Sequence, residues 1–243
     1  LKTHLSREEV KNFKMPDLDK DEMMTRAVEY IDYFKEMLPD YIHVYQPDTQ
    51  GPFDIAHLVY GDDIFLEFYD DPEFVHELME ICTQMYIEVS KRLKKAIGEE
   101  NNKCYHGHAL ARGIYLDSGG VRISEDSATL ISPEQIEEFV VPYVSKAFQE
   151  FGGGYIHYCG KSVPLLDAFL KMDEVRAINF GNPEKYDFDE TMKKFLDHDK
   201  CCFGLWPKEE GETLKNYIKT MKDDSEEGTR GLLLHFDEAM FSE

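Results

Sequence analysis

The second half of the sequence alternates between short apolar runs and amphipathic helical stretches. After a helix predicted over Pro133–Phe151, apolar runs predict strands, and apolar residues at helical spacing between them predict helices. The predicted strands are Tyr155–Tyr158, Val175–Phe180, Cys202–Trp206 and Leu232–Phe236, and the predicted helices are Ser162–Leu170, Phe188–Leu196 and Thr213–Met221. This alternation predicts an α/β fold with a parallel sheet, either open or closed into a barrel.

The first half of the sequence is more helical. A stripe over Asp19–Leu38 (Met24, Val28, Ile31, Phe34 and Leu38) predicts one helix, and the long stripe over Pro72–Ile97 predicts another. Between them, Tyr41–Tyr45 predicts a short strand. The stretch Gly107–Asp126 is too long for an ordinary connection between a strand and a helix, which is typical of a functional loop. A length of 243 residues fits a single domain over 1–243.

The charge of the chain limits its partners. It has 27 basic and 49 acidic residues, a net charge of −22, and such an acidic chain repels nucleic acid and anionic lipid. It contains no apolar window long enough to span a membrane. Its five cysteines are odd in number and lack framework spacing, which favours reduced thiols and a cytoplasmic location.

The ends of the predicted strands are where we expect the chemistry, because active sites of parallel sheets gather at the carboxyl ends of the strands. The residues at these ends are Gln46, Asp48, His157, Cys159, Asn179, Asn182, Trp206, His235 and Asp237. His157 and Cys159 are two apart, so both side chains face one side of the strand. Imidazole and thiolate are ligands that zinc accepts, although a buried histidine beside an ordinary thiol is the simpler alternative.

Two further stretches carry candidate functional residues. His106 and His108 flank a glycine and could be ligands or substrate contacts. Arg122 could clamp a carboxylate or phosphate, and Glu125 and Asp126 could act as a base, a proton donor or metal ligands. An ordinary ion pair at a helix entrance explains the second stretch equally well. Cys201 and Cys202 face opposite ways in a strand, which favours a role in packing.

Several of these motifs occur together in a known order. They are Gly51-Pro52-Phe53, Ile131-Ser132-Pro133-Glu134, Glu138-Phe139-Val140-Val141-Pro142-Tyr143 and His157-Tyr158-Cys159-Gly160. Over roughly residues 40 to 240, the chain resembles the uroporphyrinogen decarboxylase-like superfamily. That superfamily includes the decarboxylase itself and the corrinoid-dependent methyltransferases. The resemblance implies a TIM-type (β/α)8 barrel, here incomplete or abbreviated, because its opening strands would precede Leu1 and its closing helix would follow Glu243.

The resemblance is closer to the methyltransferase branch than to the decarboxylase. The decarboxylase relies on an arginine-rich N-terminal segment, whereas the first fifty residues here contain only Arg7 and Arg26. The methyltransferase branch has a His-x-Cys pair, matched by His157 and Cys159, and a third zinc ligand, usually a cysteine after the last strand. Here that strand ends without a cysteine, so His235 or Asp237 could substitute, or the metal could be absent.

The resemblance thus implies a methyltransferase that moves a methyl group between a corrinoid, or another methyl donor, and a thiol-type acceptor activated by zinc. Glu125 and Asp126 would supply a further ligand or a proton relay, and Arg112 and Arg122 would position the anionic tail of a small-molecule substrate. A partner protein would present the corrinoid, and a homodimer is a further expectation. The alternatives are a tetrapyrrole polycarboxylate decarboxylase and a non-catalytic barrel that binds a ligand or partner.

Overall fold

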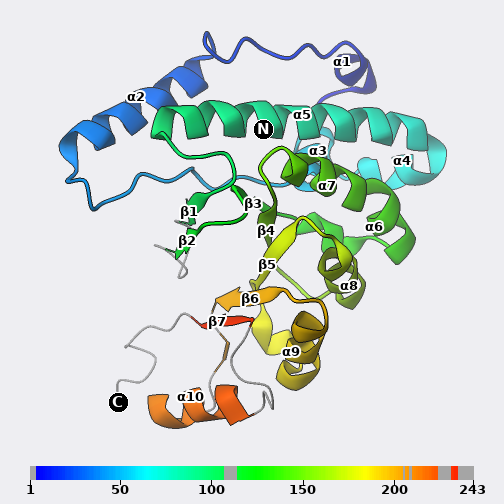
Figure 1. Cartoon of the computed structure of the whole chain (residues 1–243). Helices are drawn as coiled ribbons and strands as arrows, with labels where there is room; N and C mark the ends of the chain where they lie inside the picture. Colours follow the sequence, from blue (N-terminus) through cyan, green and yellow to red (C-terminus); the bar gives the residue numbers. More distant parts are fainter. Residues whose placement is uncertain (1–3, 107–113, 205, 208–209, 224–230, 235–243) are drawn as a thin grey trace.

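The computed structural model describes residues 4–106, 114–204, 206–207, 210–223 and 231–234 (Figure 1). The helices are α1 (Arg7–Lys11), α2 (Glu22–Met37), α3 (Pro52–Tyr60), α4 (Ile64–Asp70), α5 (Pro72–Ile97), α6 (Pro133–Phe139), α7 (Val141–Gln149), α8 (Val163–Lys171), α9 (Phe188–Asp197) and α10 (Leu214–Asp223). The strands are β1 (Cys104–His106), β2 (Ile114–Leu116), β3 (Val121–Ser124), β4 (Gly154–Tyr158), β5 (Val175–Phe180), β6 (Cys201–Gly204) and β7 (Leu232–Leu234). Short 3₁₀ helices cover Ser127–Leu130 and Pro183–Lys185.

Five strands form one parallel sheet in the order β3-β4-β5-β6-β7, so each strand pairs with the next one along the chain. The predicted α/β class and parallel sheet are therefore confirmed. Within the described residues the sheet is open, with β3 and β7 at its edges, so the closed barrel stays a prediction. Strands β1 and β2 form a separate antiparallel hairpin, and Gln50 makes an isolated parallel bridge with Ser124 at the β3 edge.

The two faces of the sheet are covered differently. Alternate strand residues such as Ile123, Ile156 and Ile178 belong to the main hydrophobic core, together with residues of helices α3 to α9. The opposite face holds a smaller apolar cluster that includes Tyr155 and Phe203. Figure 1 shows α6, α7, α8 and α9 along one side of the strands and the β1–β2 hairpin on the other. Polar strand ends are therefore available on the face that the helices leave uncovered.

The longest predicted helix is confirmed with the bounds that the sequence predicts. Helix α5 begins after Asp71, whose side chain accepts a hydrogen bond from the Phe74 amide, and it ends at Gly98 in the left-handed region. The helix predicted over Pro133–Phe151 is instead two helices, α6 and α7, which meet at Val140. Pro142 lies in the first turn of α7, because proline lacks the amide hydrogen that a continuous helix would need there.

The region before α5 differs most from the sequence prediction. The strand expected at Tyr41–Tyr45 is wrong, because this segment is irregular and largely exposed. Helices α3 and α4 occupy a stretch for which no element was predicted. Phe34, expected on the buried stripe of α2, is exposed, and the residues buried there are Met24 and Ile31. A tyrosine-rich run favours a strand only where a neighbouring strand can pair with it.

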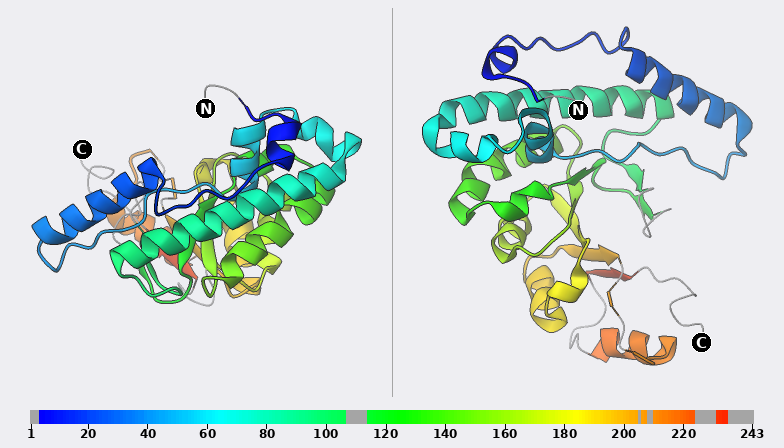
Figure 2. Two further views of the ribbon diagram at one scale, coloured as in Figure 1. Left: turned by 90° about the horizontal axis from the view of Figure 1, so that it is seen from above. Right: turned by 180° about the vertical axis from the view of Figure 1, so that it is seen from behind.

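Helix α2 lies at the periphery of the molecule. It packs along one end of α5, and its other sides face away from the sheet (Figure 2). None of the described helices is both long and apolar enough to cross a bilayer.

Candidate metal centre

Three side chains converge at the carboxyl ends of β3 and β4. Asp126 follows β3, His157 lies in β4 and Cys159 follows β4. One potential ligand atom from each residue lies within 4.8 Å of the other two. His157 pairs in register with Ser124, so Asp126, two residues beyond Ser124, projects to the same side of the sheet. The structure thus brings together three of the candidate residues named from the sequence.

His157 is held by a residue of the neighbouring strand. Its Nδ1 lies 2.6 Å from Oδ1 of Asn179, and Nδ2 of Asn179 donates a hydrogen bond of 2.7 Å to the Phe203 carbonyl. Because that bond makes Oδ1 of Asn179 the acceptor, Nδ1 of His157 carries the proton and Nε2 keeps its lone pair. Gly204 has φ +125°, and a Cβ there would collide with Nδ2 of Asn179. The histidine is therefore oriented with Nε2 toward Cys159.

Cys159 is positioned by its backbone and by two glycines. Its amide donates a hydrogen bond of 2.6 Å to Oδ1 of Asp126, which ties the end of β4 to the end of β3. Gly160 adopts φ +96°, which suits glycine. The Gly160 amide donates a hydrogen bond to Oδ1 of Asn182. A Cβ at Gly181 would collide with the Cys159 sulfur. Partial desolvation, and then the Asp126 carboxylate, raise the pKa of the Cys159 thiol.

The donor set and its spacing fit zinc. Zinc binds imidazole nitrogen at about 2.0 Å and thiolate sulfur at about 2.3 Å, so two such ligands of a tetrahedral ion lie about 3.5 Å apart. Nε2 of His157 and Sγ of Cys159 are 3.4 Å apart. The Asp126 carboxylate adds an oxygen ligand of a kind that zinc also accepts. One imidazole, one thiolate and one carboxylate would leave a fourth position for a substrate.

Glu125 lies in a different environment from its neighbour. It is fully buried, and its two carboxylate oxygens accept hydrogen bonds from the amides of Phe53 and Asp54 in the first turn of α3. Desolvation, and then the nearby Asp54 carboxylate, raise the pKa of Glu125 well above its ordinary value. Gly51 leaves room for this carboxylate, since a Cβ there would collide with it. The Glu125 carboxylate therefore contacts the first turn of α3 and does not belong to the group of Asp126, His157 and Cys159.

Asp54 is a buried acid that the sequence reasoning missed. It accepts hydrogen bonds from the amides of Asp126 and Ser127, at 2.9 and 2.7 Å. Desolvation raises the pKa of this carboxyl group. Asp54 thereby fixes the backbone that carries Asp126. Its position directly after Gly51-Pro52-Phe53, a stretch already singled out, is the sequence signal that could have identified it.

Arg122 faces a cavity of about 290 Å³ on the same side of the sheet as His157. It is nearly buried and forms an ion pair with Asp48. Desolvation lowers the pKa of the Arg122 guanidinium, and the Cys159 thiol is among the groups that its charge influences. The cavity is lined by Tyr45, Gln46, Pro47, Thr49, Cys104, Tyr105, Gly120, Val121 and Tyr155 in addition to Asp48 and Arg122.

The other candidates lie elsewhere. His106 is in β1, which belongs to the hairpin and not to the sheet that carries His157. His108, Arg112, His235 and Asp237 lie outside the described residues. Their predicted roles stay predictions.

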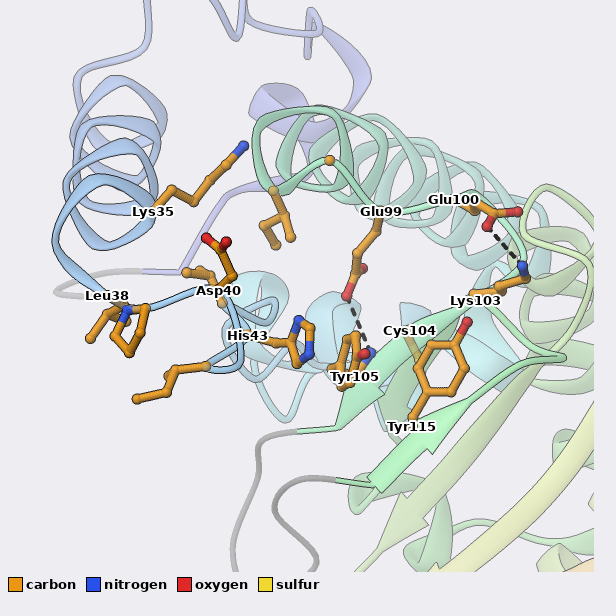
Figure 3. A pocket seen from close by; sticks show the side chains of 15 residues that line it. Lys35, Leu38, Asp40, His43, Glu99, Glu100, Lys103, Cys104, Tyr105 and Tyr115 are labelled. Atoms are coloured by element: carbon orange, nitrogen blue, oxygen red, sulfur yellow. Dashed lines mark hydrogen bonds and ion pairs between the residues drawn. The ribbon is translucent and has the colours of Figure 1, made fainter.

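A larger cavity, of about 390 Å³, lies between the segment after α2 and the end of α5 (Figure 3). Glu99, Glu100 and Lys103 among its charged groups have partners within the chain. Glu99 accepts hydrogen bonds from the Lys94 ammonium and the Tyr105 amide, and Lys103 pairs with Glu100. The ring of His43 stacks on that of Tyr105, with centroids 4.1 Å apart. None of the three residues of the metal-ligand group lines this cavity.

Comparison with known proteins supports the fold. No protein-family model matches the sequence, and no curated protein matches it significantly. Among solved structures, a methyltransferase from Methanosarcina mazei is similar, with a TM-score of 0.64 and 13% sequence identity. The match covers 93% of this chain and 62% of the methyltransferase. The chain therefore shares its fold with about three-fifths of that enzyme.

Proposed function

We propose that the protein is a zinc-type methyltransferase that transfers a methyl group to a thiol. The observation that carries this proposal is the convergence of Asp126, His157 and Cys159 at the carboxyl ends of two neighbouring parallel strands. Asp126 is the third protein ligand in this proposal, in place of the cysteine that the methyltransferase branch usually has after its last strand.

The chemistry follows from the donor set. Zinc in this position would stabilise the thiolate form of an acceptor and so supply a nucleophile at neutral pH. The acceptor sulfur forms a bond to the methyl carbon while the bond between that carbon and the donor breaks, and the thiol proton passes to solvent. Asn179 would hold the neutral His157 ring in the tautomer with the proton on Nδ1, which leaves the Nε2 lone pair for the metal. The Arg122 side chain lines the cavity, where an anionic part of the substrate would compete with Asp48 for its guanidinium.

The superfamily, the closed barrel and the corrinoid go beyond the structural comparison and belong to the proposal. The similar structure is named a methyltransferase, and helices on one face of a sequentially ordered parallel sheet suit a segment of a (β/α)8 barrel. We therefore retain the uroporphyrinogen decarboxylase-like superfamily, the barrel, and a corrinoid presented by a partner protein as parts of the proposal. A tetrapyrrole decarboxylase would need several basic side chains to hold the substrate carboxylates, and among the described residues Arg122 is the one basic side chain that lines the cavity beside the ligand group.

The test begins with the metal. The purified chain is expected to bind one zinc per chain by elemental analysis, and Asp126→Asn, His157→Ala and Cys159→Ser are expected to lower that content. Zinc content unchanged in all three variants would overturn the site.

Activity is tested with methylcobalamin as the donor and 2-mercaptoethanol as a small thiol acceptor. The expected result is loss of the methylcobalamin absorbance together with formation of the methyl thioether, both abolished in Cys159→Ser. Zinc binding without transfer to any of a series of small thiols would keep the metal site and reject the methyltransferase.

A further inference from the structure

Helix α2 carries two separate apolar stripes. One stripe, formed by Met24, Ala27, Val28 and Ile31, packs with residues of α5 in a small hydrophobic cluster of its own. The other, which we call the outer stripe, follows the same helical spacing about a third of a turn away and is exposed. The outer stripe consists of Met23, Tyr30, Tyr33, Phe34 and Met37.

The outer stripe is unusually large for a surface feature. Its residues are 45–81% exposed, and Tyr41, just beyond the helix, is 79% exposed. Because large side chains of this kind offer about 150–250 Å² each, the five residues of the outer stripe leave roughly 600 Å² of mostly apolar surface in water. The largest apolar patch of a typical monomer is about 300–600 Å², whereas each partner in a standard protein interface contributes about 800 Å². The area is close to what a stable dimer requires.

The order of side chains along the outer stripe is self-complementary. Met23 and Met37 each lie seven residues, or two helical turns, from Tyr30. Arg26 and Phe34 each lie four residues from Tyr30. A two-fold axis at Tyr30 would therefore place Met23 of each copy against Met37 of the other. It would also place the Arg26 guanidinium of each copy over the Phe34 ring of the other, which is a cation–π contact.

We propose that the outer stripe is the interface of a homodimer in which two α2 helices pack antiparallel about Tyr30. Of the acidic residues of α2, Asp32 lies on the side of the helix opposite the outer stripe, Glu29 and Glu36 lie at its edge, and Glu22 pairs with Arg26. Asp32 therefore stays in solvent when the stripes meet. With a net charge of −22 on each copy, long-range repulsion opposes the association, so salt is expected to strengthen it.

The first experiment measures the mass of the full chain by sedimentation equilibrium. The wild-type chain is expected to dimerise, with a lower dissociation constant at 0.5 M than at 0.05 M NaCl. Tyr30→Lys/Phe34→Lys is expected to raise the dissociation constant by about thirtyfold or more, as for loss of central contact residues. The control is Leu66→Lys/Tyr69→Lys on α4, where the side chains are 63% and 78% exposed. It makes the same change in net charge and is expected to dimerise as the wild type does.

The second experiment tests the register. Met23→Glu and Met37→Lys alone are each expected to weaken the dimer, and the double variant is expected to recover affinity, because each new glutamate meets the partner's new lysine. The two positions are too far apart to interact within one helix. Circular dichroism of each variant checks that helix content is kept.

Three results would overturn the proposal. They are a wild-type chain that stays monomeric at 100 μM in both salt concentrations, equal weakening by the α2 and α4 lysine pairs, and no recovery in the double variant. In the first case, the outer stripe would instead be open to a partner of different sequence.

Discussion

Glu125 and Asp126 are consecutive acids whose surroundings differ completely. Glu125 is buried and accepts two backbone amides of α3, whereas Asp126 is partly exposed and lies within ligand distance of His157 and Cys159. Both follow β3, which ends at Ser124 on the same side as His157. The alternation of strand side chains continues past the strand, so position 126 faces the site and position 125 faces the helices. A shift of one position along the chain therefore separates Glu125, an acid with a structural role, from Asp126, a candidate ligand.

The same contrast extends to the residues that support each acid. Gly51 makes room for Glu125, and Gly181 makes room for Cys159. The contact between Gly51 and Glu125 lies in the core, where displacing the Glu125 carboxylate would leave the buried Phe53 and Asp54 amides without an acceptor. The contact between Gly181 and Cys159 lies at the surface, where water can replace a lost contact. We therefore expect changes around Glu125 to alter stability and changes around Asp126 to alter metal binding.

The largest effect is expected for Glu125→Ala. The substitution leaves the Phe53 and Asp54 amides buried without an acceptor and opens a cavity, so the unfolding free energy should fall by about 3 kcal/mol. Glu125→Gln keeps the volume and one acceptor and should cost about 1 kcal/mol. Urea unfolding of the metal-free proteins measures both. Loss of zinc from a Glu125→Ala protein of unchanged stability would reverse the roles that we assign to the two acids.

Cys159→Ser is expected to have the opposite profile. Loss of a ligand should weaken zinc binding by more than about a hundredfold, the upper end for loss of an outer contact. Because the side chain is exposed, the unfolding free energy of the metal-free protein should change by no more than about 0.5 kcal/mol. Competition titration with a chromophoric chelator gives the affinity. An equal loss of stability in the metal-free state would mean that Cys159 has a packing role.

Asn179→Ala tests whether the site depends on the orientation of His157. Without Oδ1 of Asn179, the imidazole can rotate and change tautomer, so zinc affinity should fall by about tenfold. The matched control is Asn12→Ala, which removes an exposed asparagine that caps α1. The same titration applies. Unchanged affinity in Asn179→Ala would show that His157 needs no support from β5.

The smallest effect is the pH dependence of stability. The pKa of Glu125 is raised in the folded protein above its ordinary value of 4.5, so the folded state holds a proton that the unfolded state releases. The resulting stabilisation is complete below about pH 4.5 and is lost as the pH rises through the folded pKa. The unfolding free energy of the wild type relative to Glu125→Gln should therefore fall as the pH rises above about 4.5. A difference that is flat or rises with pH would contradict the assigned protonation.

Sequence patterns predicted an element well where its own residues define it. The strand Val175–Phe180 and the helix Pro72–Ile97 have the predicted bounds. The prediction was wrong at Tyr41–Tyr45, because whether such a run becomes a strand depends on what lies beside it. Helices α3 and α4 were missed because Gly51-Pro52-Phe53 was considered as a motif and not as the start of a helix, although proline in the first turn is a helix signal.

The candidate site could be predicted in part. Period-two spacing placed His157 and Cys159 on one side, and the same rule, applied from Ser124 onward, would have separated Asp126 from Glu125. The contact of Asn179 with His157 depends on the register between β4 and β5, which includes a shift at Gly154 and Tyr155. No pattern within either strand contains that shift. Sequence therefore indicated the ligands, and only the paired strands showed how one ligand is oriented.

The sequential strand order also bears on how the chain acquires its structure. Every pair of neighbouring strands in the five-stranded sheet joins consecutive segments of the chain. A nascent chain leaving the ribosome can therefore add each new strand to an edge that is already present, with the intervening helix closing over it. The ligand group is supported by Asp54 of α3, by β3, β4 and β5, and by the carbonyl of Phe203, all of which precede β7, so it can assemble before synthesis reaches β7.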